Sequence, residues 1–509
     1  MYISSSVLAL AGLTATAAAE TIHGALIFAR HGDRTSKHYP NYVLTSLGAR
    51  QVFQVGSFYR SRYLSSSSPH RIQNISEFEH VPAQVWASAP DTSVLLATAN
   101  AFLQGLYPPL GDIKPSLAAQ ELANGSSVEG PLTGYQYVTL HGINDDSPET
   151  IWIKGDDDCP AVKAASDDFK GSTEFQARLA STREFYKSLY PYVSNVYSSP
   201  EELSYEKAYD IFDVINVAKI HNTSSSAVEN VTDEQMFQLR TLADSAEFGL
   251  NFNASQPDRS LHAQTFIASV LDHLNKTVTS ADRNPKLTLL AGSYDTFLAF
   301  FGLAGLIDVS PDFYGLPEYA STMVFEVFTP DDDDGDVDID EDGDGPLPDT
   351  DALRVRYLFR NGTDGALRAF PLFGGRTTDD EDPSMSWADF VRAVQAVGVD
   401  SPAEWCIRCR SPAVFCAAYN NSSDVDNDSA ADVGGELTGV DRRSWIAVLV
   451  VMAVAVAGNL VWAAMWLVRS RRLAAEKRAT IAVAEVAGVA GVMTSRGSES
   501  VISVEKQSV

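Results

Sequence analysis

Short apolar runs alternate with segments of helical periodicity in the N-terminal part of the chain. The run 21–29 is mostly apolar and ends at a charged cluster, which predicts a buried strand. Residues 45–63 place apolar side chains three and four positions apart after a capping threonine, which predicts a helix. The same patterns predict a second strand at 85–87 and a second helix at 91–106.

The middle of the chain has a different pattern. From about 164 to 277 the spacing is helical, most clearly at 201–220 and 232–250. Strand patterns then return, at 287–291, 322–328 and 353–359. This order predicts an α/β fold, with a central, mostly parallel sheet flanked by helices and a helical cap inserted at about 110–280.

Two apolar segments at the ends of the chain predict its compartment. Residues 7–19 are apolar or small and stop before Glu20, which is typical of a secretory signal peptide spanning 1–19. Residues 445–468 contain no ionisable side chain. At the rise of an α-helix they extend about 36 Å, enough to span a bilayer. A buried core helix is the alternative, although core helices rarely stay apolar on every face.

Basic residues orient the apolar C-terminal segment. Five of them lie within 469–478, after the segment, whereas two precede it. The positive-inside rule then predicts a single-pass type I membrane protein with an extracellular or lumenal ectodomain and a cytoplasmic tail at 469–509. A GPI signal is not expected, because the hydrophobic segment continues into a charged one. The ectodomain is expected at 20–416, followed by a polar stalk at 417–444.

The charge is strongly negative and unevenly spread. A formal net charge of −28 excludes a basic stripe for nucleic acid. Residues 331–351 hold twelve acidic and no basic side chains, which predicts a disordered acidic insertion at 329–351. Asp338, Asp340, Asp342 and Gly343 match the opening of a calcium loop, but prolines fill the loop and no helix flanks it, so no metal site is predicted.

Sequons and cysteines agree with a secreted domain. Ten Asn-x-Ser/Thr sequons all precede the membrane segment, at Asn74, Asn124, Asn222, Asn230, Asn253, Asn275, Asn361, Asn420, Asn421 and Asn427. The four cysteines, Cys159, Cys406, Cys409 and Cys416, are predicted to form structural disulfides, because no second Cys pair or His cluster completes a redox or zinc site. Three pairings are possible; we expect Cys159–Cys406 and Cys409–Cys416, since the second closes a short loop.

The sequence Arg30-His31-Gly32-Asp33-Arg34 carries the strongest chemical signal. Arginines bind phosphate oxygens through planar, bidentate contacts. Nearby cations disfavour protonation of an imidazole, so His31 is expected to keep a nitrogen lone pair in acid. A neutral imidazole amid fixed positive charge suits nucleophilic attack on phosphorus. The alternative is a loop at a strand end with solvated arginines.

This segment resembles the R-H-G-x-R-x-P motif of the histidine acid phosphatases, in the phosphoglycerate mutase-like superfamily. Further similar segments follow in order over roughly 20–416: 44–63, 101–108, 158–160 and 289–306. The resemblance implies His31 as the nucleophile, Asp295 as the general acid, and Arg30, Arg34 and Tyr294 around the phosphate. It departs from the family at three positions. Tyr294 replaces a histidine, Val94 replaces a third phosphate arginine, and Ser36 replaces the motif proline.

The resemblance implies an acid phosphatase that hydrolyses phosphomonoesters through a phosphohistidine and needs no cofactor or metal. The expected partners are a small phosphorylated substrate and, through one helix, a membrane, but not nucleic acid. The departures keep a second hypothesis open, a catalytically impaired member that binds phosphorylated ligands. Neither the substrate nor the oligomeric state follows from the sequence, nor does it show that His31 and Asp295 meet in space.

Overall fold

The computed structural model describes residues 20–221, 227–280, 284–330, 350–375 and 383–420. The predicted signal peptide, almost all of the acidic insertion and stalk, the predicted membrane helix at 445–468 and the predicted tail lie outside these residues. Within the described ranges, no helix is both long and apolar enough to cross a bilayer.

A mixed sheet forms the centre of the described chain. Its strands are β1 (Glu20–Arg30), β2 (Val85–Pro90), β5 (His141–Ile143), β6 (Leu287–Gly292), β7 (Thr322–Pro330), β8 (Arg354–Arg360), β9 (Arg368–Phe370) and β10 (Met385–Ser386). Their order is β10-β8-β7-β1-β6-β2-β5, with β9 also paired to β8. A separate hairpin joins β3 (Ala119–Glu121) to β4 (Ser127–Glu129).

The prediction of a mostly parallel sheet was wrong. Only the half that contains β1, β6, β2 and β5 is parallel. β7 runs antiparallel to β1, and β8 runs antiparallel to β7, β9 and β10. The physical reason is that strand direction depends on how the strands are connected, which apolar patterns do not show. β7 and β8 are consecutive among the described strands and pair directly, and such neighbours are most often antiparallel.

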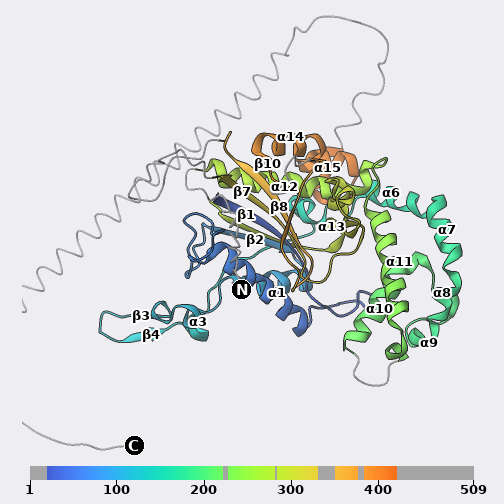
Figure 1. Cartoon of the computed structure of the whole chain (residues 1–509), viewed down its shortest axis with the longest axis horizontal. Coiled ribbons are helices and arrows are strands. Elements are labelled where there is room, and N and C mark those ends of the chain that lie inside the picture. Colours follow the sequence, from blue (N-terminus) through green and yellow to red (C-terminus); the bar gives the residue numbers. More distant parts are fainter. Residues whose placement is uncertain (1–19, 222–226, 281–283, 331–349, 376–382, 421–509) are drawn as a thin grey trace, which may run out of the picture. The chain divides into compact units, whose positions relative to one another are not determined.

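Helices cover both faces of the sheet (Figure 1). Alternate side chains of β1 point to opposite faces, as the pleat requires. Ala25 and Ile27 join the core formed with α1 (Ser46–Tyr59) and α2 (Ser93–Leu106). Leu26 and Phe28 join the core with α12 (Leu261–Thr279) and α13 (Tyr294–Leu303). The Phe28 ring centroid lies 4.7 Å from that of Phe266 on α12. The strand is therefore buried on both sides, which explains its unbroken apolar run.

The helical cap lies beside the sheet (Figure 1). It comprises α6 (Pro160–Lys170), α7 (Thr173–Ser181), α8 (Arg183–Ser188), α9 (Tyr190–Val193), α10 (Ala208–His221) and α11 (Asp233–Asn251). The cap is shorter than the predicted insertion at 110–280, because β5 joins the main sheet and α12 packs on it. The remaining α-helices are α3 (Leu110–Ile113), α4 (Pro131–Gly134), α5 (Ile151–Lys154), α14 (Trp387–Val397), α15 (Pro402–Cys409) and α16 (Ala417–Asn420).

All four cysteines form disulfides, but the predicted pairing was wrong. The bonds join Cys159 to Cys409 and Cys406 to Cys416. Helix α15 ends at Cys409, and Arg410 takes a left-handed conformation at φ 50°, which turns the chain back. Cys416 therefore returns to Cys406, one turn earlier on the helix, and Cys409 is left to meet Cys159 at the start of α6. The long-range bond ties the cap to the C-terminal segment.

Six sequon asparagines have described side chains. Five of them are exposed, namely Asn74, Asn124, Asn230, Asn275 and Asn361. Asn253 is half-buried, and the side chains of the other four lie outside the described part of the chain. This exposure leaves glycosylation sterically open, and the modification itself stays a prediction.

Candidate active site

Two parallel strands bring the predicted nucleophile and acid to one edge of the sheet. Strand β1 ends at Arg30, which is in register with Gly292 at the end of β6. His31 follows the first strand directly, and Tyr294 and Asp295 begin α13 after the second. The carboxyl ends of parallel strands are the usual place for a ligand site in an α/β fold. The sheet thus explains how residues 264 positions apart share one edge.

His31 is buried, with 2% of its surface exposed. Its Nδ1 lies 2.8 Å from the Gly32 carbonyl oxygen, so Nδ1 carries the proton and donates it. The other nitrogen, Nε2, has no hydrogen-bond partner in the described part of the protein. Burial lowers the pKa of His31 well below its usual value, and the charges of Arg30, Arg34 and Lys37 lower it further. His31 therefore holds a neutral ring with a free lone pair on Nε2, as a nucleophile requires.

Arg30 is held mainly by aromatic rings. Its guanidinium carbon lies 4.8 Å from the ring centroid of Tyr319 and 5.3 Å from that of Tyr294. One terminal nitrogen donates to the Pro317 carbonyl, and Nε has no partner among the described groups. Arg30 also lines a cavity of about 400 Å³. Its guanidinium thus keeps donors that a phosphate can accept.

Arg34 is held by a carboxylate from the cap. Its side chain is fully buried and pairs with Asp213 of α10, with Nη2 3.0 Å from Oδ1 and Nη1 3.2 Å from Oδ2. Nη2 also donates to the Tyr209 hydroxyl at 2.9 Å. The Ser36 hydroxyl and the Lys37 amide each donate to Asp213 at 2.8 Å. Ser36, which stands where the family has proline, therefore adds a donor to this carboxylate.

Two further pairs join the same loop to α10. The His221 Nε2 lies 2.7 Å from a carboxylate oxygen of the fully buried Asp33. The His38 Nδ1 lies 3.1 Å from a carboxylate oxygen of Asp210. We call residues 33–38 with these partners on α10 the loop–cap contact. The second half of the motif is therefore built into the interface with the cap.

Tyr294 does not offer its hydroxyl hydrogen to the phosphate position in this structure. The hydroxyl donates to Oε2 of Glu247 on α11 at 2.9 Å. A phenol has one hydrogen to donate, so this bond uses it. Burial raises the pKa of Glu247 to about 7, although the Tyr294 bond and the charge of Lys37 oppose that rise. Tyr294 instead presents its ring, which contacts Arg30 and lies 4.9 Å from the Lys37 ammonium.

Asp295 lies in the first turn of α13, where its Oδ1 accepts the Thr296 amide at 2.9 Å. It is close enough to Lys37 to raise the pKa of that amine, against the larger lowering effect of burial. It also contributes to the raised pKa of Asp156, about 6, for which burial is the first cause. Lys37 thus interacts electrostatically with both His31 and Asp295, which connects the two predicted catalytic groups.

Helix α2 supplies no cation where the family has its third arginine. Val94 is buried there, with 2% of its surface exposed. Within the described part of the chain, no group of three or more His, Cys, Asp or Glu side chains is placed to hold a metal ion.

Sequence reasoning missed four charged residues around this site. Lys37 follows the motif directly, so a search for extra cations near the motif would have found it. Asp213 and Glu247 lie on cap helices without any motif, and Asp156 begins an acidic run before Cys159. Asp213 contacts Arg34, 179 positions away, and Glu247 contacts Tyr294, 47 positions away, so only the fold brings these pairs together.

Comparison with known proteins gives one family. The profile described as histidine phosphatase superfamily (branch 2) matches residues 35–359, a range that includes Asp295 and begins just after Arg34. Lysosomal acid phosphatase of Xenopus laevis is 25% identical over 320 residues, which cover 59% of this chain and 65% of the Xenopus protein. Human prostatic acid phosphatase is 24% identical over 320 residues, which cover 60% of this chain and 72% of the human protein.

A solved structure supports the fold. The phytase of Klebsiella sp. ASR1 aligns with a TM-score of 0.50 and 13% identity, over 78% of this chain and 99% of the phytase. At this identity the likeness extends to the fold alone.

Proposed function

This chain belongs to branch 2 of the histidine phosphatase superfamily, and we propose that it hydrolyses phosphomonoesters through a phosphohistidine on His31. The observation that carries the proposal is the state of His31. Its Nδ1 proton is donated to Gly32, and its Nε2 lone pair has no partner among the described groups. Acid phosphatases from Xenopus and human are among its relatives.

The first step transfers the phosphoryl group to the enzyme. Nε2 of His31 attacks phosphorus, a P–N bond forms, and the P–O ester bond breaks. Asp295 gives a proton to the departing oxygen, which leaves as an alcohol. Arg30 and Lys37 hold the negative phosphoryl oxygens, and Lys37 supplies charge that Val94 does not.

The second step regenerates the enzyme. Water attacks the phosphohistidine and loses a proton to the Asp295 carboxylate, and inorganic phosphate leaves as the P–N bond breaks. Because burial and three cations lower the pKa of His31, the nucleophile stays neutral in acid. We therefore assign the enzyme an acidic working range.

The second candidate is a binding protein for phosphorylated ligands. Two contacts favour it, the pairing of Arg34 with Asp213 and the hydrogen bond from Tyr294 to Glu247. Each contact engages a side chain that the sequence predicted to bind phosphate. One assay separates the two candidates. Full-length protein and its His31→Ala variant are incubated with phenyl phosphate at pH 5, after thermal melts show that both fold. Hydrolysis by the wild type alone supports the enzyme. Inactivity of both, with stabilisation by inorganic phosphate, supports the binding protein.

We also propose that the folded domain is displayed outside the cell or in a lumen by one membrane helix. The apolar segment 445–468, the one-sided sequons and two disulfides support this location. Treatment of cell-expressed protein with an N-glycosidase should raise its gel mobility, and alkaline carbonate should leave it in the membrane pellet. Release by carbonate would refute the membrane anchor.

A further inference from the structure

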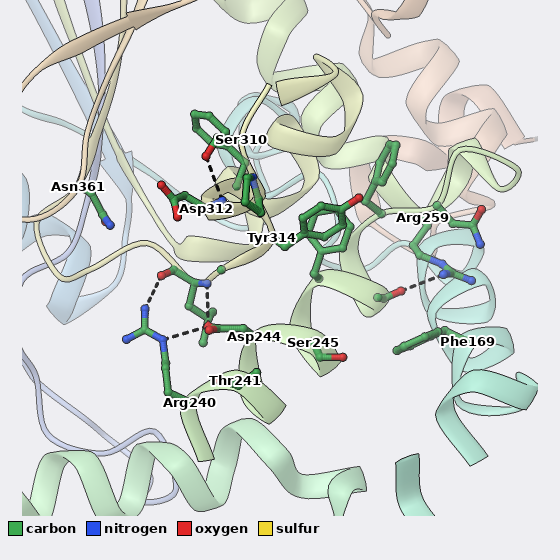
Figure 2. Close-up of a pocket in the computed structure, with 18 of the residues that line it drawn as sticks. Phe169, Arg240, Thr241, Asp244, Ser245, Arg259, Ser310, Asp312, Tyr314 and Asn361 are labelled. Carbon is green, nitrogen blue, oxygen red and sulfur yellow. Dashed lines mark hydrogen bonds and ion pairs between the residues drawn. The ribbon is translucent and has the colours of Figure 1, made fainter. Parts of the chain in front are cut away.

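A second, larger cavity adjoins the one that Arg30 lines. It has a volume of about 1180 Å³ and lies between the cap helices α6, α7 and α11 and the segments 310–316 and 359–370 (Figure 2). Arg240, Leu316, Asn361 and Gly365 line both cavities. A molecule with its phosphate at Arg30 thus has a large neighbouring space into which its other end can extend. We call this space the side cleft.

The walls of the side cleft are rich in aromatic rings. Seven aromatic side chains line it. The ring of Phe248 on α11 contacts that of Tyr314, with ring centroids 4.7 Å apart, and the ring centroids of Phe313 and Phe370 are 4.9 Å apart. Tyr314 is 45% exposed, and Figure 2 shows it between Arg240 on one side and Arg259 on the other. Its face is therefore available for an aromatic ligand to stack on.

The charges of the side cleft balance and are largely used within the protein. Four arginines and four acidic residues line it. Arg240 binds Asp244 at 2.9 Å and Glu318 at 3.1 Å, and Arg178 pairs with Glu174 at 3.4 Å.

Arg259 donates to the Ala165 and Gly249 carbonyl oxygens and to Gln256. Of the lining arginines, Arg368 alone has neither an ion pair nor a side-chain hydrogen bond with the described groups. A ligand that carries several phosphates needs several free cations to offset its desolvation, and these walls do not provide them.

From these observations we propose that the side cleft binds the leaving group of the substrate, and that the substrate is a monophosphate ester of an aromatic alcohol with more than one ring. This deepens the proposed function and rests on it. The single phosphate lies at Arg30, and the uncharged aromatic part stacks on Tyr314 and the neighbouring phenylalanines. Polyphosphorylated polyols are excluded by the same walls.

The test compares two esters with leaving groups of similar acidity, phenyl phosphate and 2-naphthyl phosphate, and adds myo-inositol hexakisphosphate. We expect the full-length protein to prefer the naphthyl ester by about fivefold in kcat/KM, because a second ring buries more apolar surface. Tyr314→Ala should lower kcat/KM for the naphthyl ester more than for phenyl phosphate, mainly through KM, and so remove most of the preference. Tyr314→Phe should retain the preference.

Phe237→Ala is the matched control, because Phe237 lies on α11, is 73% exposed and is not among the residues that line the side cleft. This variant should leave kcat/KM unchanged for both aryl esters. Equal kcat/KM for the two aryl esters, a preference that survives Tyr314→Ala, or faster hydrolysis of the hexakisphosphate would overturn the inference and leave the phosphatase proposal standing. Failure to hydrolyse any of the three compounds would overturn both.

Discussion

Arg30 and Arg34 flank the same histidine, yet different parts of the molecule hold them. Arg30 lies between the rings of Tyr294 and Tyr319, lines a cavity, and keeps an unpartnered Nε among the described groups. Arg34 is fully buried and paired with Asp213 of the cap. The two sides of the loop around His31 therefore differ: Arg30 lines a cavity, and Arg34 belongs to the loop–cap contact.

This difference separates two kinds of cation that look alike in the motif. A guanidinium held by rings can add hydrogen bonds to a phosphate without losing a charged partner. A guanidinium paired with a buried carboxylate stabilises the interface, and removing it leaves an uncompensated charge. We therefore expect substitutions on the two sides to affect different measurements.

The largest effect is expected from Arg34→Met. The Asp213 carboxylate, 2% exposed, then stays buried without its cation, which should cost about 3–5 kcal/mol of unfolding free energy. Urea denaturation measures this loss. The double variant Arg34→Met with Asp213→Leu should recover most of it, because neither charge remains. A stable single variant would show that the two arginines are equivalent after all.

The next effect is expected from Arg30→Met, and it concerns catalysis. A charge-assisted hydrogen bond contributes about 1.5–3 kcal/mol, so kcat/KM for phenyl phosphate should fall roughly ten- to a hundredfold or more. Arg30→Lys should keep part of the activity, because it keeps the charge. The opposite result would be an Arg30→Met protein that is less stable than Arg34→Met but keeps full specific activity. It would show that Arg30 stabilises the fold and does not bind the phosphate.

Lys37→Met should have a smaller effect that also changes the pH profile. Removing this ammonium should lower kcat/KM about tenfold, because one phosphate contact is lost. Lys37 also lowers the pKa of His31, so the pKa should rise in the variant. The acidic limb of kcat/KM should then move to higher pH, since protonated His31 is not a nucleophile. If kcat/KM falls by the same factor at every pH and the acidic limb of its pH profile does not move, this electrostatic role of Lys37 is contradicted.

Glu247→Gln should change a different property, the pH dependence of stability. The folded pKa of Glu247 is raised to about 7 from 4.5, so the folded protein retains a proton that the unfolded chain loses. The stability from this group is present below pH 4.5 and is lost as pH rises toward 7. Thermal melts should therefore show the wild type losing stability relative to the variant over this window. Parallel profiles would argue against a buried protonated carboxyl on the Arg30 side.

The sequence predicted much of the local structure and less of the site. The apolar runs located the central strands to within a few residues, because burial on both faces leaves a clear pattern in β1 and β6. Strand direction was missed, since it depends on connections and not on composition.

The family motif predicts His31 and Asp295 as catalytic residues, but it does not predict the different surroundings of Arg30 and Arg34. That difference comes from Asp213, 179 positions away in a helix whose pattern predicts only a buried face. The exchange of the disulfide partners has a similar origin, because the turn after α15 decides which cysteine meets Cys159.

The central claim is that His31 carries the phosphoryl group, and trapping that intermediate tests it most directly. Asp295→Asn protein is mixed with 2,4-dinitrophenyl phosphate, whose acidic leaving group departs without protonation, and is quenched in alkaline denaturant, in which phosphohistidine survives. Peptide mass spectrometry then locates the phosphoryl group. The account predicts phosphorylation of His31 and none in a variant that also carries His31→Ala. Phosphorylation of another residue, or steady hydrolysis by the His31→Ala protein, would contradict it.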